Sequence, residues 1–171
     1  MDEPSDLAQL RSIVEAAPDP VDEEIGLLFH RSLSPPSYDQ TPRNVLTFAS
    51  TGGDGVQFSL LVHDGAVGND SAVVMTVPGA RHPNRIVGRS LRHFLGLGRH
   101  SSYFVLEQFQ YDFGETVQRL EKRDYWQALS RDARRLLDRL ERDIKITAWS
   151  DISRELAALD AEFTQQLDQK N

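Results

Sequence analysis

The sequence contains no cysteine among its 171 residues. This absence excludes disulfide bonds, a thiolate nucleophile and thiolate metal ligands. No apolar run approaches the roughly 20 residues that a membrane-spanning helix needs. The first thirty residues are rich in Asp and Glu and lack the apolar stretch of a signal peptide. We therefore expect a cytoplasmic protein that does not bind membranes.

Hydrophobic residues make up 39% of the chain and charged residues 26%, which is typical of an ordinary globular protein. A chain of this length can bury a sizeable core within one domain. We expect a single domain over residues 1–171. We find no internal repeat and no low-complexity tract.

The chain has fewer basic than acidic residues, 19 against 26, which gives a formal net charge of −7. Such a charge disfavours binding to DNA and to anionic membranes, because both repel an acidic surface. Residues 71–106 are the exception, since they contain no Asp or Glu. This zone is either a solvated basic face or a binding site. As a binding site, its Arg-rich part at residues 81–99 would make the chain a domain that binds a small anion or a nucleotide, and the candidate residues are Arg85, Arg89, Arg92 and Arg99.

The first half of the chain predicts one helix and an antiparallel sheet. Residues 5–17 have apolar residues at helical spacing, with Ser5 as the expected N-cap. Residues 22–33 fit either a short second helix or the start of the sheet. Strands are expected where β-branched and aromatic residues gather between Gly- and Asp-rich turns, and tight turns favour antiparallel pairing. These strands cover residues 44–50, 56–62 and 71–77.

After Pro83 the apolar period changes from two to about 3.6, which predicts helices. The expected helices cover residues 88–98, ending at Gly96 and Gly98; 106–120, with a break at Gly114; 130–144, capped by Ser130; and 150–167, capped by Ser150. Strands early and helices late indicate an α+β domain. We expect an antiparallel sheet with helices packed on one face and a C-terminal helical extension.

The stretch "TGGDG", residues 51–55, resembles a phosphate-binding loop only in composition. A P-loop ends in Gly-Lys-Ser/Thr, and a dinucleotide loop opens a helix, whereas this stretch is followed by a strand. We therefore interpret it as a hairpin bend, in which Asp54 bonds its own turn backbone. The stretch "GLGRHSS", residues 96–102, has the residue types of an anion-binding loop, but it follows a helix and is interpreted as an interhelical turn.

No residue pattern indicates an enzyme. The five histidines lack the spacing of a zinc-binding helix, and no serine lies in a Gly-x-Ser-x-Gly elbow. We expect no catalytic residue, no metal and no cofactor.

Three stretches together resemble a known family. They are "PPSYDQTPRNVLTFASTGGDGVQFSLL", "SAVVMTVPG" and "IVGRSLRHFLGLG". Their order is similar to that of the SMI1/KNR4-like, or SUKH, superfamily: a Pro-x-x-Tyr motif, a Gly-rich turn before an aromatic strand, a Val-rich strand and a helix that starts "SLRHFL". The Asn-Gly that usually follows the Tyr is missing, and two helices extend beyond the common core.

The resemblance implies a SUKH-like core at about residues 25–112, followed by C-terminal helices at about 115–169. It also implies an α+β protein-binding module, such as an immunity protein that neutralises a toxin, often a nuclease. An acidic module would be steered towards a basic nuclease by charge. The candidate partner-binding residues are Asp19, Asp22, Glu23, Glu24 and Asp54.

Overall fold

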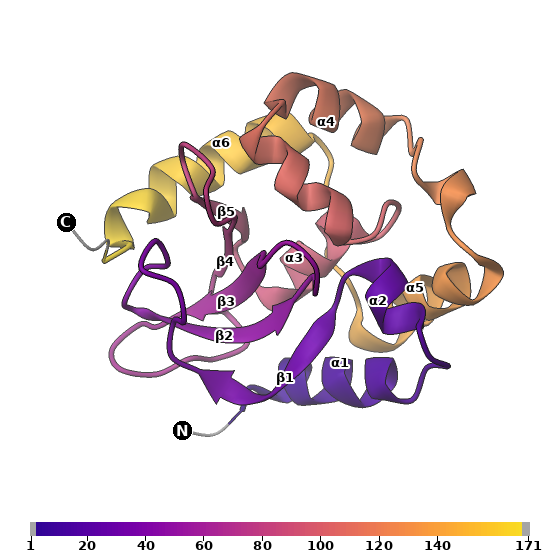
Figure 1. Ribbon diagram of the computed structural model, residues 1–171, viewed down its shortest axis with the longest axis horizontal. Helices are drawn as coiled ribbons and strands as arrows, with labels where there is room; N and C mark the ends of the chain where they lie inside the picture. Colours follow the sequence, from indigo (N-terminus) through magenta and orange to yellow (C-terminus); the bar gives the residue numbers. More distant parts are fainter. Residues whose placement is uncertain (1–2, 169–171) are drawn as a thin grey trace.

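The structure is a computed structural model that describes residues 3–168 (Figure 1). Residues 1–2 and 169–171, at the two ends of the predicted domain and of the predicted C-terminal helices, lie outside the described residues. In chain order the elements are α1 (Ser5–Glu15), α2 (Val21–Ile25), β1 (Leu28–Ser34), β2 (Val45–Ser50), β3 (Gln57–Leu61), β4 (Val73–Thr76), β5 (Asn84–Gly88), α3 (Leu91–Gly98), η1 (Phe104–Gln110), α4 (Phe113–Glu121), η2 (Trp126–Ala128), α5 (Arg131–Ile144), α6 (Ile152–Phe163) and η3 (Thr164–Gln166).

The five strands form one sheet in the order β1-β2-β3-β4-β5, and each neighbouring pair is antiparallel. This confirms the predicted α+β class and the antiparallel meander. The three predicted strands correspond to β2, β3 and β4. The sequence does not predict strand β5. Strand β1 agrees with one of the two interpretations of residues 22–33, in which this segment starts the sheet.

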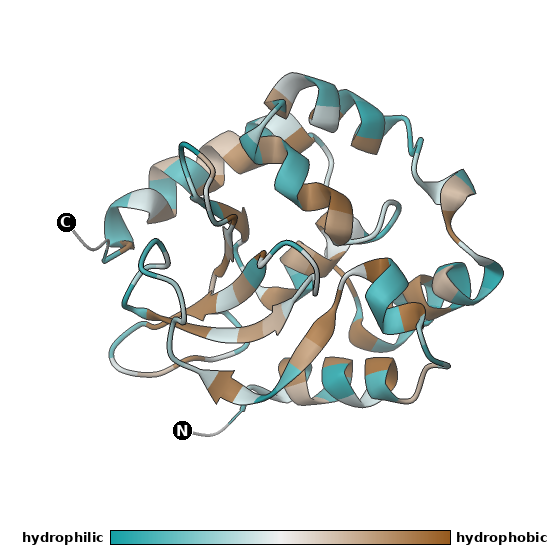
Figure 2. Ribbon diagram, viewed as in Figure 1, coloured by the Kyte–Doolittle hydropathy of each residue, from teal (hydrophilic) through white to brown (hydrophobic). Residues whose placement is uncertain are grey.

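The larger part of the core lies between one face of the sheet and the helices α1 and α3. Phe48, Phe58 and Met75 of the sheet are buried there against Phe94 of α3 and Leu10 of α1. Phe58 and Phe94 are in direct ring contact, with centroids 4.9 Å apart. In Figure 2 the strands carry mainly apolar residues, while the helices alternate between hydrophilic and hydrophobic residues along their length.

Helix α6, the last part of the C-terminal extension, covers the opposite face of the sheet, whereas α5 packs against α1 and α2. Val74 and Ile86 form a smaller apolar cluster there with Leu159 of α6, and Phe163 packs against it. The last described residue, Asp168, is held beside β2, because the backbone N–H of Arg43 donates to its carbonyl at 2.8 Å. The prediction places helices on one face of the sheet only. In the structure, helix α6 also covers the other face.

Residues 22–33 contain both a helix and a strand. Helix α2 ends at Ile25, Gly26 has a left-handed φ of 70°, and β1 begins at Leu28. A Cβ atom at Gly26 would lie 2.7 Å from the backbone nitrogen of Phe104. Tyr103, the residue before η1, donates its backbone N–H to the Ile25 carbonyl at 2.8 Å. Glycine at position 26 thus permits both the turn and the close approach of η1.

Several predicted helix ends differ from the structure. Pro4, not Ser5, is the N-cap of α1, and Asp151, not Ser150, caps α6 by accepting the Arg154 N–H. Ser130 caps α5 as predicted. The break within residues 106–120 lies at Asp112, which caps α4, and not at Gly114.

Helix α3 includes both glycines at its predicted end. Gly96 lies inside the helix and Gly98 is its last residue, so only Gly98 acts as the predicted terminator. Among residues 3–168, no helix is long and apolar enough to cross a membrane.

Candidate functional site

Two of the predicted anion-binding arginines contact helix α6. The guanidinium of Arg85 donates to Asp160 at 3.2 Å and lies 5.0 Å from the ring centroid of Phe113. Burial raises the pKa of Asp160, and the nearby Arg85 offsets part of that effect. Arg89 lies 3.1 Å from Glu162, and both of these side chains are about half exposed. The two arginines therefore hold the C-terminal helix against the edge of the sheet.

The other two predicted arginines are also paired, with different elements. Arg92 forms two hydrogen bonds of 2.7 Å to Asp6, a buried residue of α1. Arg99 is 7% exposed and binds Asp138 and Glu141 of α5. The acidic partners of all four arginines come from outside residues 71–106. The structure thus brings none of the four together in one site, and each charge faces a carboxylate.

The acidic segment at residues 19–24 divides into two parts. Glu24 accepts hydrogen bonds from the N–H and the hydroxyl of Ser130, at 2.6 and 2.7 Å, and so fixes α2 to the start of α5. Asp22 accepts the N–H of Glu23 at 2.9 Å. Among the described residues, no cation lies within ion-pair distance of Asp19, Asp22 or Glu23. These three carboxylates remain uncompensated.

Asp54 does not make the turn hydrogen bond predicted for it. In the structure its carboxylate makes no hydrogen bond within the described residues, so it does not bond its own turn. The hairpin bend itself is confirmed, with φ values of 94° and 72° at Gly52 and Gly55. The stretch "TGGDG" is therefore a turn that presents Asp54 to solvent.

The negative charge of Asp54 instead acts on Glu107 of η1. Burial raises the pKa of Glu107, a hydrogen bond from Gln108 lowers it, and the negative charge of Asp54 raises it further. Phe104 is on the same side of η1 as Glu107, because residues three apart align in a 3₁₀ helix, and it is 38% exposed. We call Asp22, Glu23, Asp54, Glu107 and Phe104 the acidic surface, and η1 and α2 are neighbours in Figure 1.

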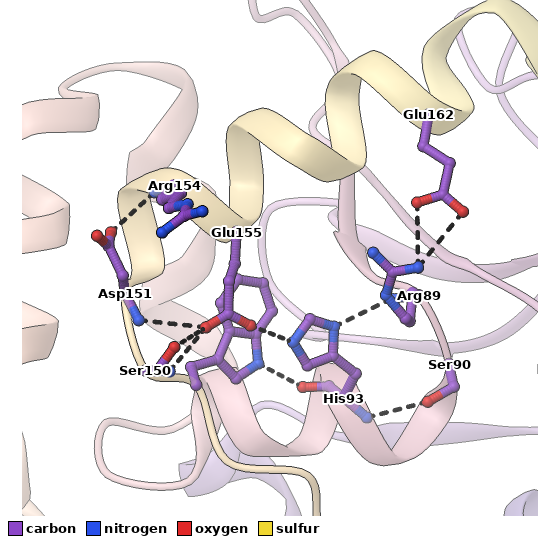
Figure 3. Close-up of polar contacts among 9 residues, drawn as sticks. Arg89, Ser90, His93, Ser150, Asp151, Arg154, Glu155 and Glu162 are labelled. Atoms are coloured by element: carbon purple, nitrogen blue, oxygen red, sulfur yellow. Dashed lines mark hydrogen bonds and ion pairs between the residues drawn. The ribbon is translucent and has the colours of Figure 1, made fainter.

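A second polar cluster joins α3 to α6 (Figure 3). His93 is 5% exposed, and its Nε2 lies 2.9 Å from Glu155. Its Nδ1 lies 3.3 Å from the backbone nitrogen of Arg89, which is a donor. The Nδ1 is therefore the acceptor, and the Nε2–H donates to the carboxylate. Trp149 donates its indole N–H to the His93 carbonyl at 2.6 Å.

The electrostatics of this cluster keep His93 neutral and Glu155 ionised. Burial lowers the pKa of His93 more than Glu155 raises it. Burial alone would raise the pKa of Glu155, but the N–H groups of Ser150 and Asp151 and the imidazole of His93 lower it to about 2. Each partner in the cluster is satisfied, so it has the properties of a structural clamp and not of a general base awaiting substrate.

The structure adds residues that sequence reasoning missed. His93 and Glu155 lie 62 positions apart, and Glu107 lies 53 positions after Asp54, so no local spacing could reveal either pair. Phe104 lies in an apolar run of the sequence, so its exposure could not be told from its neighbours. Within residues 3–168, no group of three or more His, Cys, Asp or Glu side chains is placed to hold a metal ion.

Comparison of the chain with models of protein families, with characterised proteins and with solved structures yields no match.

Proposed function

We propose that this chain is a non-enzymatic protein-binding module that recognises a basic protein through the acidic surface. The observation that carries the proposal is that Asp54 and Glu107 have no cation within ion-pair distance among the described residues, while the ring of Phe104, one turn of η1 before Glu107, is 38% exposed. Two carboxylates without a cation, next to an aromatic side chain, suit a partner that supplies Lys or Arg.

The distribution of charge in the fold supports this choice. The arginines of residues 85–99 are neutralised within the chain, whereas Asp22, Glu23 and Asp54 are not. The excess of negative charge is therefore available on the surface, where it would steer a basic partner and increase its association rate.

The resemblance to the SUKH superfamily supports a more specific proposal. A member of that superfamily with an acidic surface suits an immunity or regulatory role, and the partner we propose is a toxin, in particular a basic nuclease. Glu24 also accepts two hydrogen bonds from Ser130 at the junction of α2 and α5, and because it is exposed it stays a candidate for partner binding.

The proposal is tested by affinity capture with the intact chain in an extract of its own cells, followed by kinetic measurements on each captured protein. The double variant Asp54→Lys/Glu107→Lys should lower the association rate of the partner at least tenfold at low salt. The difference should shrink as salt rises, because screening acts on exposed charges.

The matched control is the pair Asp64→Lys/Asp70→Lys, which makes the same change of net charge in another loop, at two exposed side chains of which Asp64 is 91% exposed. This control should leave the association rate within about twofold of wild type. Equal weakening by the control and by the double variant would show that only net charge matters and would contradict the acidic surface. Capture of no protein, together with turnover of a small substrate, would overturn the proposal as a whole.

A further inference from the structure

A cavity of about 380 Å³ lies on a different part of the molecule, between the end of α3, the end of α4 and the segment that joins α5 to α6. A volume of this size falls in the range of small-molecule sites, roughly 300–1,000 Å³. The acidic surface contributes no residue to the cavity.

Part of the cavity wall is apolar, and polar side chains line the rest. The apolar side chains come from four elements: Leu97 from α3, Leu120 from α4, Ile146 and Trp149 from the α5–α6 segment, and Ile152 from the start of α6. Trp149 is held in place, because His93 stacks on its indole and accepts its N–H through the backbone carbonyl. A rigid wall of this kind can bury the apolar body of a ligand.

The charged residues of the lining differ in how well they are compensated. Arg99 is fixed by Asp138 and Glu141 and lies 5.1 Å from the ring centroid of Trp126. Arg123 also lines the cavity, and no carboxylate of residues 3–168 lies within ion-pair distance of it. Arg123 was not among the arginines that the sequence suggested for anion binding.

His100 lines the cavity together with Arg99 and Arg123. Its ring meets the indole of Trp126 edge-on, with centroids 5.8 Å apart. Burial lowers the pKa of His100, and the charges of Arg123 and Arg99 lower it further, against the weaker opposite effects of Glu141 and Asp138. The local field at His100 is thus positive, which favours an anion at this position.

We propose that this cavity binds a small organic anion with an apolar body. The apolar body lies against Leu97, Ile146 and Trp149, and the anionic group meets Arg123 and His100. Glu121, which also lines the cavity, opposes the anion and limits its affinity. This site is independent of the surface proposed for the protein partner.

The experiment uses 1-naphthoate as the probe and neutral 1-naphthylmethanol as its matched control, with binding measured by calorimetry on the intact chain. We expect 1-naphthoate to bind at least tenfold more tightly than the alcohol. Arg123→Gln should weaken the binding of 1-naphthoate at least tenfold, whereas Glu121→Gln should strengthen that binding. Arg131→Gln, an equal change of charge at an exposed position outside the cavity, should have no effect.

A second measurement follows the imidazole of His100 by NMR. Bound 1-naphthoate should raise its pKa, and 1-naphthylmethanol should not. Equal affinity for the two compounds would overturn the anionic part of the proposal, and failure of both to bind at millimolar concentration would overturn the site. Capture of a protein partner through the acidic surface should be unchanged in Arg123→Gln, so failure of this proposal is distinguishable from failure of the proposed function.

Discussion

His93 stacks on Trp149 with ring centroids 4.0 Å apart and planes only 9° from parallel. This contact joins α3, which packs on one face of the sheet, to the segment that leads into α6 on the other. The same imidazole binds Glu155 at the start of α6. One buried side chain therefore links the C-terminal helix to the rest of the fold.

The first prediction concerns this link. His93→Ala removes the stack and the hydrogen bond to Glu155, and we expect it to lower the free energy of unfolding by about 2–3 kcal/mol, from the loss of an aromatic contact and a charge-assisted bond. Chemical denaturation measures the change. His63→Ala, at a side chain that is 84% exposed, is the control and should be nearly neutral. Equal effects of the two substitutions would contradict the clamp.

The second prediction concerns acid stability. The pKa of Glu155 falls from its usual 4.5 to about 2 in the folded chain. A lowered pKa means that ionised Glu155 stabilises the fold above pH 4.5, and that this contribution is lost as the pH falls from 4.5 towards 2. Denaturation at a series of pH values should show this loss. In Glu155→Gln the curve should be flatter between pH 4.5 and 2, and an unchanged curve would contradict the assignment.

The third prediction separates the arginines that the sequence grouped together. Asp6 is buried, so Arg92→Ala leaves its carboxylate without a cation and should destabilise the chain by about 1–3 kcal/mol. Arg89 and Glu162 are both exposed, so Arg89→Ala should cost at most about 1 kcal/mol. Thermal melting of the two variants side by side measures the difference, and a larger cost for Arg89→Ala would contradict it.

The order of the central strands could be predicted from the sequence, while the edge strand β5 could not. Strands β2, β3 and β4 are apolar and bounded by Gly- and Asp-rich turns, which is a local signal. Strand β5 begins with Asn84 and Arg85 directly after Pro83, and its pairing with β4 is what makes it a strand. Short edge strands with polar residues lack the alternation on which such a prediction depends.

The candidate sites could be predicted less well than the fold, because their contacts are long-range. The sequence shows that residues 71–106 lack acids, but not that Asp6, Asp138 and Asp160 come back to this zone in the folded chain. Proximity of this kind depends on how helices pack, which residue spacing does not encode.

The fourth prediction concerns Asp54. Because its carboxylate makes no hydrogen bond in the described residues, Asp54→Ala should change the free energy of unfolding by less than about 0.5 kcal/mol. It should also lower the pKa of Glu107, since one of the causes that raise it disappears. Denaturation and NMR titration of Glu107 measure the two effects. A loss of about 1 kcal/mol would show instead that Asp54 bonds its turn in solution.

The fifth prediction tests the approach of the α5–α6 segment to α3. A Cβ atom at Gly96 would lie 2.0 Å from the Thr147 carbonyl oxygen, a distance that no real contact allows. Gly96→Ala should therefore push this segment away from α3 and lower the free energy of unfolding by about 1–3 kcal/mol, the usual cost of overpacking. A Cβ at Gly53 meets nothing within 4 Å, so Gly53→Ala is the control. Gly96 and Ile146 both line the cavity, so Gly96→Ala should also weaken the binding of 1-naphthoate. If the variant kept both its full stability and tight binding of 1-naphthoate, the α5–α6 segment would lie farther from α3 than the structure shows.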